Sequence, residues 1–170
     1  MSIIVDRFKK IKSNINNLDN SKTINIVAIS KTFSIEHIEP LLNIGHDHFG
    51  ENKVQEAMSK WREIKKKDSN LKLHMVGKLQ SNKSKKAVEL FDFIHSLDNK
   101  KLADNLSKAE TEIKKNLKYF IQVNIGNEDQ KSGVSLNDLN EFFSYCTKEK
   151  KLNVIGLMCI PPNDNNEEKY

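Results

Sequence analysis

Residues 24–30 read INIVAIS, a short and nearly continuous run of apolar, mostly β-branched residues, and Lys31 and Thr32 follow directly. Such a run without polar alternation is typical of a strand that is buried on both faces, as in a parallel sheet. A lysine at the end of a buried strand is unusual, because an ammonium group in apolar surroundings pays a large desolvation cost. Lys31 is therefore either a side chain that reaches outward to water or a functional amine.

The same pattern, a short apolar strand followed by a helix, recurs along the rest of the chain. Apolar side chains at helical spacing separate the expected strands and predict at least five intervening helices. Strict alternation of this kind predicts parallel strands joined by right-handed crossovers. The further strands are expected at residues 47–50 (DHFG), 71–76 (LKLHMV), 92–97, 117–125 (LKYFIQVNI) and 152–160 (LNVIGLMCI).

Two predictions concern helices near the N-terminus. Pro40 lies inside the helix expected after the first strand and should kink or shorten it. A further helix is expected before the first strand, because five apolar residues recur there at intervals of three and four. These residues are Ile4, Phe8, Ile11, Ile15 and Leu18.

Two architectures are compatible with six strands in α/β alternation. One is a doubly wound open sheet, and the other is a TIM-type (β/α)₈ barrel, which has eight units and typically about 250 residues. A barrel of 170 residues would be incomplete, with six of its strand–helix units present. We expect residues 1–170 to form a single domain, in which residues 161–170 are a loop leading into a helix that is cut off.

The composition excludes several classes of protein. The net charge of +5 comes from 28 Lys and Arg against 23 Asp and Glu. Only Arg7 and Arg62 are arginines, whereas proteins that read nucleic acid usually depend on arginine. The longest apolar runs are far too short for a membrane span or a signal peptide. We therefore expect a cytoplasmic protein without nucleic-acid partners, in which Cys146 and Cys159 are two buried thiols.

Polar residues and glycines gather directly after the expected strands. Because the carboxyl ends of parallel strands meet at one edge, this clustering predicts a functional site there. Lys31 belongs to this edge, and desolvation would favour its neutral amine, a nucleophile toward aldehydes. The other segments are FGEN (49–52), HMVGKLQSNK (74–83), SLD (96–98), VNIGNEDQKSG (123–133) and GLMCIPP (156–162).

Three other groups of residues were considered as sites. His46 and His48 flank Asp47, but no third or fourth ligand is evident, so a metal site is not expected. Ser132 and Gly133 suit an ordinary turn as well as a pocket. A cluster around residues 78–86 is either a solvated face or an anion site, which a Lys83→Glu plus Lys85→Glu double substitution would test. Its members are Lys78, Ser81, Asn82, Lys83, Lys85 and Lys86.

The order and spacing of AISKT, FGENKVQE, HMVGKLQSNKSK, SLD, NIGNEDQKSG and GLMCIPP resemble the YggS-type pyridoxal phosphate homeostasis proteins. These proteins are similar to the N-terminal barrel domain of alanine racemase. The resemblance covers the chain from about residue 24 onward and implies a TIM-type barrel that binds pyridoxal 5′-phosphate (PLP). It implies that Lys31 forms the covalent Schiff base. It also implies that Asn52 lies near the cofactor and that His74 and Met158 line the pocket.

The resemblance also has a limit. The family continues through two further strand–helix units, with a G-M-S segment that helps bind the phosphate and an R-I-G segment whose arginine lies near the pyridine nitrogen. Neither segment occurs in this sequence. Each charge-assisted hydrogen bond is worth roughly 1.5–3 kcal/mol, so we expect a sharply lower cofactor affinity.

The sequence leaves three functional hypotheses. The first is a non-enzymatic, monomeric module that buffers PLP or delivers it to apo forms of PLP-dependent enzymes. The second is an amino-acid racemase or a related enzyme, which would need a positioned base that the sequence does not reveal. The third is a fragment without function, because an incomplete barrel leaves strand edges unpaired.

Overall fold

The computed structural model describes residues 2–17, 24–126, 128 and 132–161. Its strands form one six-stranded sheet in the order β1-β2-β3-β4-β5-β6, and every neighbouring pair is parallel. A doubly wound sheet reverses its strand order at a switch point, and this sheet does not, so the barrel prediction is confirmed. The strands are β1 (Ala28–Ile29), β2 (His48–Glu51), β3 (Lys72–Met75), β4 (Phe93–Leu97), β5 (Lys118–Gln122) and β6 (Asn153–Met158).

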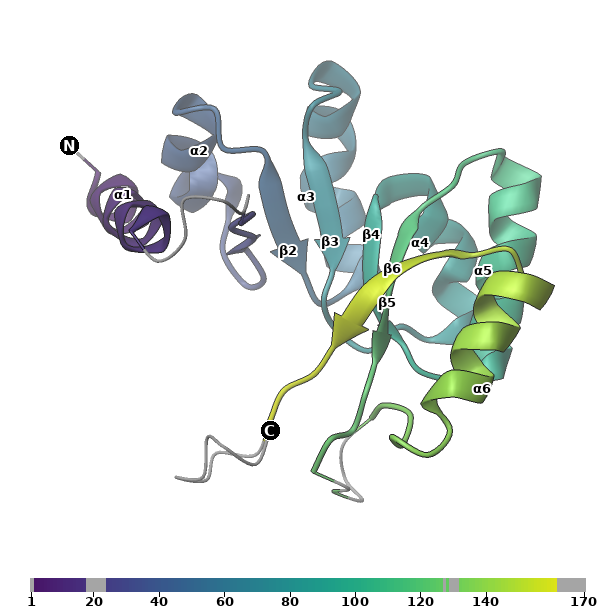
Figure 1. The fold of residues 1–170 in the computed structure, drawn as a ribbon. Helices are drawn as coiled ribbons and strands as arrows, with labels where there is room; N and C mark the ends of the chain where they lie inside the picture. The colour runs from purple at the N-terminus through teal and green to yellow at the C-terminus, as the bar shows by residue number, and fades with distance from the viewer. Residues whose placement is uncertain (1, 18–23, 127, 129–131, 162–170) are drawn as a thin grey trace.

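The helices run along one side of the curved sheet, and α1 lies at the β1 end (Figure 1). We call the sheet face that the helices cover the outer face and the opposite one the inner face. A 3₁₀ turn, η1 (Ser81–Lys83), leads into α4, and a π-helical turn, η2 (Tyr145–Glu149), continues α6. The helices are α1 (Ile3–Asn16), α2 (Ile35–Asn43), α3 (Val54–Lys67), α4 (Ser84–Leu90), α5 (Lys100–Ile113) and α6 (Leu139–Ser144).

The hydrophobic core lies between the outer face of the sheet and the helices. Side chains alternate between the two faces of a strand, so every second residue of the central strands β2 to β5 enters this core. Trp61 of α3 packs against Phe49 of β2, with ring centroids 4.9 Å apart, and both are fully buried. Burial of each such side chain stabilises the fold by roughly 1.5–3 kcal/mol. Further fully buried members from the strands are Leu73, Met75, Ile94, Tyr119 and Ile121.

The two strands at the ends of the sheet are much less covered. Within the described residues β1 and β6 each pair on one side only, and Ile29 and Leu157 are 47% and 56% exposed. The expectation that residues 24–30 form a strand buried on both faces is therefore wrong, because Ile24 and Ile29 are exposed, residues 26–28 are only partly buried, and Ser30 alone is buried. Only Ala28–Ile29 pair as strand.

The predictions for α1, α2 and the two cysteines are confirmed only in part. The N-terminal helix is confirmed as far as Asn16, whereas Leu18 lies outside the described residues. Pro40 does not end α2, which continues to Asn43. Cys146 is buried as expected, but Cys159 is exposed, so that expectation was wrong: Cys159 follows the edge strand β6.

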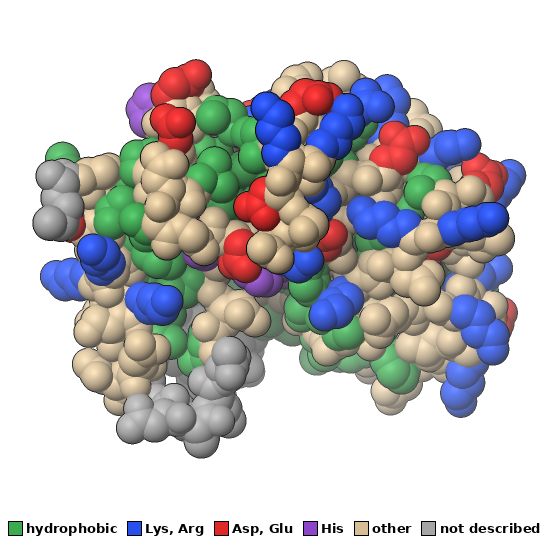
Figure 2. Space-filling model, turned by 90° about the horizontal axis from the view of Figure 1, so that it is seen from above, with side chains coloured by type: hydrophobic (Ala, Val, Ile, Leu, Met, Phe, Trp, Pro, Cys, Tyr) green, Lys and Arg blue, Asp and Glu red, His purple; other side chains and the backbone are tan. Residues whose placement is uncertain are grey.

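The surface differs between the two ends of the molecule. Seen from above, hydrophobic side chains gather on the side of α1 and α2, while lysine and arginine side chains are spread over the side of α4 to α6 (Figure 2). Among the helices of the described ranges, none combines the length and apolar character that a membrane crossing requires.

Candidate functional site

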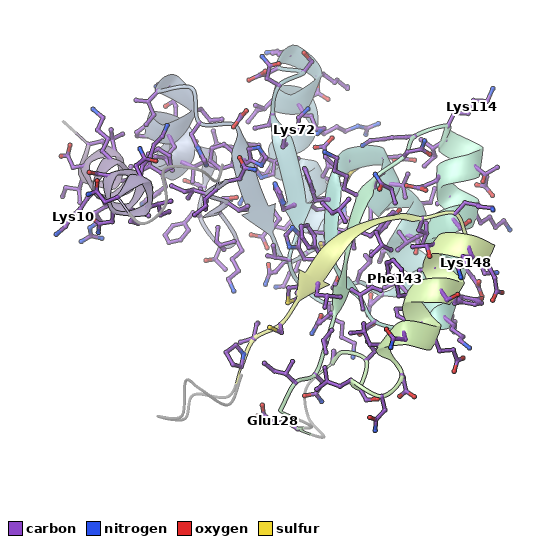
Figure 3. All side chains as sticks on the ribbon, in the orientation of Figure 1. Lys10, Lys72, Lys114, Glu128, Phe143 and Lys148 are labelled. Atoms are coloured by element: carbon purple, nitrogen blue, oxygen red, sulfur yellow. The ribbon has the colours of Figure 1, made fainter. Side chains whose placement is uncertain are left out.

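All six strands run in the same direction, so their carboxyl ends meet at one rim of the incomplete barrel. Figure 3 shows Glu128, which follows β5, beyond this rim, whereas Lys72 and Lys114 lie at the opposite end of the sheet. The rim contains the segments after β1, β2, β3, β5 and β6 that sequence analysis singled out.

Lys31 lies in a turn just after β1, and its side chain is exposed. The expectation of a desolvated ammonium is therefore wrong for this structure, since the edge strand β1 leaves the turn open. Ser30, directly before it, is fully buried on the outer face. Thr32, directly after it, has a φ of 67°, in the left-handed region that β-branched residues rarely adopt. The lysine thus lies between a buried residue and a strained one.

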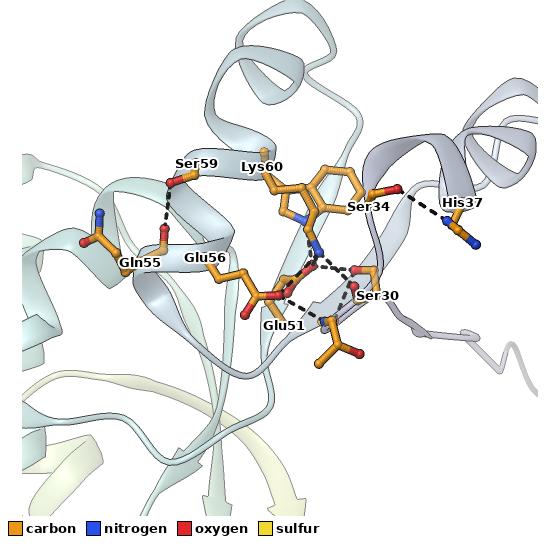
Figure 4. A network of polar contacts seen from close by, with 11 residues as sticks. Ser30, Ser34, His37, Glu51, Gln55, Glu56, Ser59 and Lys60 are labelled. Carbon is orange, nitrogen blue, oxygen red and sulfur yellow. Dashed lines mark hydrogen bonds and ion pairs between the residues drawn. The ribbon is translucent and has the colours of Figure 1, made fainter.

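Glu51, the last residue of β2, anchors the buried side of this turn (Figure 4). Its carboxylate is fully buried, and Oε1 accepts hydrogen bonds from Ser30 Oγ (2.7 Å), Lys60 Nζ (2.8 Å) and Trp61 Nε1 (2.9 Å). Glu51 Oε2 is also buried and has no hydrogen-bond partner among the described residues. Removing one member of such a buried charged network is costly, so the network fixes β1 to β2 and α3.

The same network holds the backbone on both sides of Lys31. Lys60 Nζ donates to the carbonyl oxygen of Ser30 at 2.8 Å, and the Thr32 N–H donates to Glu56 Oε1 at 3.0 Å. Strained backbone persists only where surrounding contacts over-determine it, and it concentrates at functional sites. Several contacts therefore fix the backbone of the turn that carries Lys31.

None of the site residues predicted from the sequence belongs to this network, although the sequence contains one signal that Glu51 is buried. Phe49 and Glu51 are two positions apart in a strand, so they share a face, and Phe49 is clearly a core residue. A carboxylate on the same apolar face requires a buried partner. The partners Lys60 and Trp61 lie on the following helix.

The inner face carries a chain of histidines from three neighbouring strands. His48 Nδ1 lies 2.8 Å from His74 Nε2, and His74 Nδ1 lies 2.9 Å from His95 Nε2. The rings also stack on aromatic neighbours, since His74 lies parallel to Phe93 with centroids 4.2 Å apart and His95 stacks on Phe120 at 4.4 Å. We call His48, His74 and His95 the histidine ladder.

Burial disfavours the charged form of two ladder members, His74 and His95. It lowers the pKa of His74 to about 3, with smaller contributions from His95, His48 and Lys65, and it lowers the pKa of His95 to about 4. A neutral imidazole has one donor and one acceptor nitrogen. Because both nitrogens of His74 face other rings, it donates to one neighbour and accepts from the other.

Asn52 follows β2 at the rim, and its Oδ1 is buried without a hydrogen-bond partner among the described residues. The backbone of Asn52 passes very close to Gly77 after β3, where an added Cβ would lie 2.3 Å from the Asn52 carbonyl oxygen. Gly77 is thus required for the two loops to approach each other. The orphaned oxygen is the kind of buried polar atom that a bound molecule satisfies.

Met158, the last residue of β6, lines a rim cavity of about 210 Å³. Val76 and Met158 give this rim cavity an apolar wall, and amide, hydroxyl and ammonium groups supply its polar contacts. The complete lining is Val76, Lys78, Gln122, Val123, Asn124, Ser132, Met158 and Ile160. The rim cavity thus joins the ends of β3, β5 and β6 and includes Ser132, for which the sequence left a pocket role open.

The structure does not gather the four predicted cofactor residues around one cavity. Met158 lines the rim cavity, and Asn52 lines a neighbouring one between the loops after β2 and β3. His74 lies two residues before Val76 on the inner face, with both ring nitrogens already engaged. Lys31 lies at the same rim, and strand alternation after Ile29 and Ser30 places its position on the inner side.

His46, considered with His48 for metal binding, has a different contact. Its Nε2 lies 2.8 Å from the carbonyl oxygen of His48, and burial lowers its pKa. Over the described ranges, the histidine, cysteine and carboxylate side chains form no group of three that could hold a metal ion.

Comparison with known proteins gives a consistent family assignment. The family model described as the alanine racemase N-terminal domain matches residues 7–170. The pyridoxal phosphate homeostasis protein of Pasteurella multocida is 39% identical over 143 residues, which cover 84% of this chain and 61% of that protein. The chain therefore spans about three fifths of the length of the curated relatives it matches.

Solved structures agree with this assignment. PipY of Synechococcus elongatus, determined without PLP, superposes with a TM-score of 0.80 and 35% identity over 92% of this chain and 71% of its own. PipY has also been solved with PLP bound, at a TM-score of 0.77 and 33% identity over the same shares of the two chains. An alanine racemase of Clostridium difficile has a TM-score of 0.70 at 14% identity over 97% of this chain and 44% of its own, which shows the fold alone.

Proposed function

The chain belongs to the alanine racemase N-terminal domain family, and from this premise we propose that it binds PLP covalently at Lys31 without catalysing a reaction. Its role would be to buffer the cofactor and to deliver it to apo forms of PLP-dependent enzymes. The observation that carries the proposal is the turn at Lys31, whose two neighbours are held by the network around Glu51 and Glu56.

The rim offers chemistry that fits an anionic, aromatic aldehyde. PLP, when bound, supplies an aldehyde carbon that reacts with a lysine amine, and Lys31 presents such an amine. Val76 and Met158 offer apolar surface to the faces of a ring, while Gln122 and Ser132 add polar side chains to the same lining. Asn52 Oδ1 is an acceptor that needs a donor. PLP bound to PipY, at 33% identity, supports the same cofactor for this chain.

The inner face supports a non-catalytic role. A general base must lie within hydrogen-bond reach of the proton it removes and must have a suitable pKa. His74 has a pKa of about 3, and both of its nitrogens face other histidines. His95 is likewise engaged with His74. The ladder therefore holds its own geometry rather than offering a free base to a substrate.

Borohydride reduction in the presence of PLP tests the proposal. The reduced adduct should appear on the peptide that contains Lys31 and be absent from a Lys31→Ala variant, as measured by mass spectrometry. Lys10→Ala, an exposed lysine on α1, is the matched control and should leave the Lys31 adduct unchanged. An adduct spread evenly over exposed lysines would overturn the proposed site. Alanine racemisation that depends on Lys31 would overturn the non-catalytic role.

A further inference from the structure

A second cavity at the rim has an unusual concentration of unpaired positive charge. It measures about 370 Å³ and lies between the loop that leads from β2 into α3 and the loop that follows β3. Three lysines and three side-chain amides line it, together with apolar residues, and the lining contains no carboxylate. The lining is Asn52, Lys53, Val54, Gln55, Met75, Lys78, Leu79, Gln80 and Lys83. We call it the basic cavity.

The lysines of the basic cavity differ from many others in the molecule. Within the part of the chain that the structure describes, the side chains of Lys53, Lys78 and Lys83 form no hydrogen bond or ion pair. By contrast, Lys60 pairs with Glu51 and Lys85 pairs with Glu112. Burial raises the pKa of Asp98 and the charge of Lys78 opposes this rise, but these two side chains, both within the described residues, form no ion pair.

Unpaired cations around one concavity repel each other and attract anions. A cleft lined by charge of one sign focuses the field and raises the local concentration of counter-ions. The first residues of α3, Val54 and Gln55, lie in the same lining, so the positive end of this helix adds to the potential. A bound anion would relieve the repulsion and would gain charge-assisted hydrogen bonds from the lysines.

We propose that the basic cavity is a binding site for a small phosphate monoester, separate from the Lys31 turn. Three lysines suit a dianionic phosphate better than a singly charged carboxylate. The volume of about 370 Å³ falls within the range of small-molecule pockets and exceeds the needs of a lone ion, so the phosphate would belong to an organic molecule. The side-chain amides of Gln55 and Gln80 line the same cavity and would contact its neutral part.

This assignment changes the anion hypothesis raised by the sequence around residues 78–86. Lys85 and Lys86 belong to α4 and do not line the basic cavity, although they lie close to Lys83 in sequence. The third lysine of the lining is instead Lys53, which lies in the loop between β2 and α3. Lys78 lines both the basic cavity and the rim cavity, whereas Lys53 and Lys83 line only the former.

Titration of the ¹⁵N-labelled 170-residue chain with inorganic phosphate, followed by NMR, tests the proposal. Saturable shifts are expected in the amides of residues 52–55 and 78–83. A Lys53→Gln plus Lys83→Gln double variant should bind phosphate about tenfold more weakly or worse, since two charge-assisted contacts are lost. Lys85→Gln plus Lys86→Gln removes the same net charge from outside the cavity and should leave the affinity within about twofold. Acetate at matched ionic strength should produce much smaller shifts.

The outcomes separate this site from the covalent one. Lys31→Ala should keep phosphate binding intact, and loss of binding in this variant would overturn the proposal of a separate site. Shifts that never saturate, or equal losses in the two double variants, would show that phosphate is attracted only by overall charge, and this too would overturn it. Failure of the Lys31 adduct would leave the phosphate titration unaffected, so the two proposals fail independently.

Discussion

The two faces of the same six-stranded sheet differ in how they use their side chains. The outer face is close-packed and apolar, and Phe49 and Trp61 in its core are fully buried. The inner face carries the histidine ladder, whose rings are linked end to end by hydrogen bonds. Apolar packing does not change with pH, whereas the hydrogen bonds of His74 and His95 require neutral rings and are disturbed when these rings are protonated. The outer face thus provides most of the stability, and the inner face makes the stability depend on pH.

A charged group buried on the outer face shows how this division is maintained. Glu51 lies among apolar side chains but is bonded to Ser30, Lys60 and Trp61. These contacts tie the packed face to the turn that carries Lys31. The outer face therefore also orients the turn proposed to bind PLP. Substitutions in the core of the outer face should act mainly on stability.

Trp61→Ala should have the largest effect. It removes a fully buried indole from the outer face and the N–H that donates to Glu51, so the free energy of unfolding should fall by about 3–5 kcal/mol. Phe143→Ala, at an aromatic side chain that is 45% exposed, is the control and should cost less than about 1 kcal/mol. Denaturant unfolding measures both. A similar loss in the two variants would contradict the assignment of the core to the outer face.

Acid should destabilise the protein through the inner face. The pKa of His74 is lowered from 6.5 to about 3 in the folded chain, so between these values the unfolded chain binds more protons. The stability present above pH 6.5 is therefore lost as the pH falls toward 3. At pH 5 the loss from His74 alone should reach about 2 kcal/mol, at 1.36 kcal/mol for each pKa unit.

A substitution at His74 separates this effect from general acid denaturation. His74→Phe should lower the free energy of unfolding at pH 7 by about 1–3 kcal/mol, because the new ring can stack on Phe93 but His48 Nδ1 and His95 Nε2 lose their partner. It should also flatten the dependence on pH between 6.5 and 3. His37→Phe, at an exposed position on α2, should leave the slope unchanged. If the free energy of unfolding of the wild-type protein is constant from pH 7 to pH 5, protonation of the ladder is not what destabilises the protein in acid.

The sequence predicted the strands and the rim better than it predicted the contacts between them. Apolar runs and helical spacing report burial within one segment, so the six strands and the placement of Lys31 and Met158 at strand ends were accessible. The choice between a barrel and a doubly wound sheet required the strand order, which periodicity does not encode. Strands buried on both faces lack polar alternation, so no pattern in the sequence assigned His74 to the inner face. Glu51 shares the face of Phe49, two positions earlier, but its partners Lys60 and Trp61 lie on another element and could not be predicted from one segment. The exposure of Ile29 and Cys159 likewise follows from the sheet edges, which only the pairing reveals.

Thr32 lies in the turn after β1, directly after Lys31, and its substitution should have the smallest effect on stability. Thr32→Gly keeps the left-handed backbone but removes its strain, which costs a non-glycine residue roughly 1–2 kcal/mol. Glycine also makes the unfolded chain more flexible, which destabilises the fold by about 0.5–1 kcal/mol. The net change should be a stabilisation of up to about 1 kcal/mol. Lys114→Gly, at a φ of 59° at the end of α5, should stabilise by a similar amount.

The two glycine variants should differ in their reaction with PLP. A freer turn presents the Lys31 amine less consistently, so Thr32→Gly should slow formation of the Lys31 adduct by up to about tenfold. Lys114→Gly, at the opposite end of the sheet, should leave that rate unchanged (Figure 3). The rate of adduct formation, followed by its visible absorbance, distinguishes the variants. Equal rates would show that the strain at Thr32 serves only to connect β1 to α2, and the contacts from Glu51, Glu56 and Lys60 would then be purely structural.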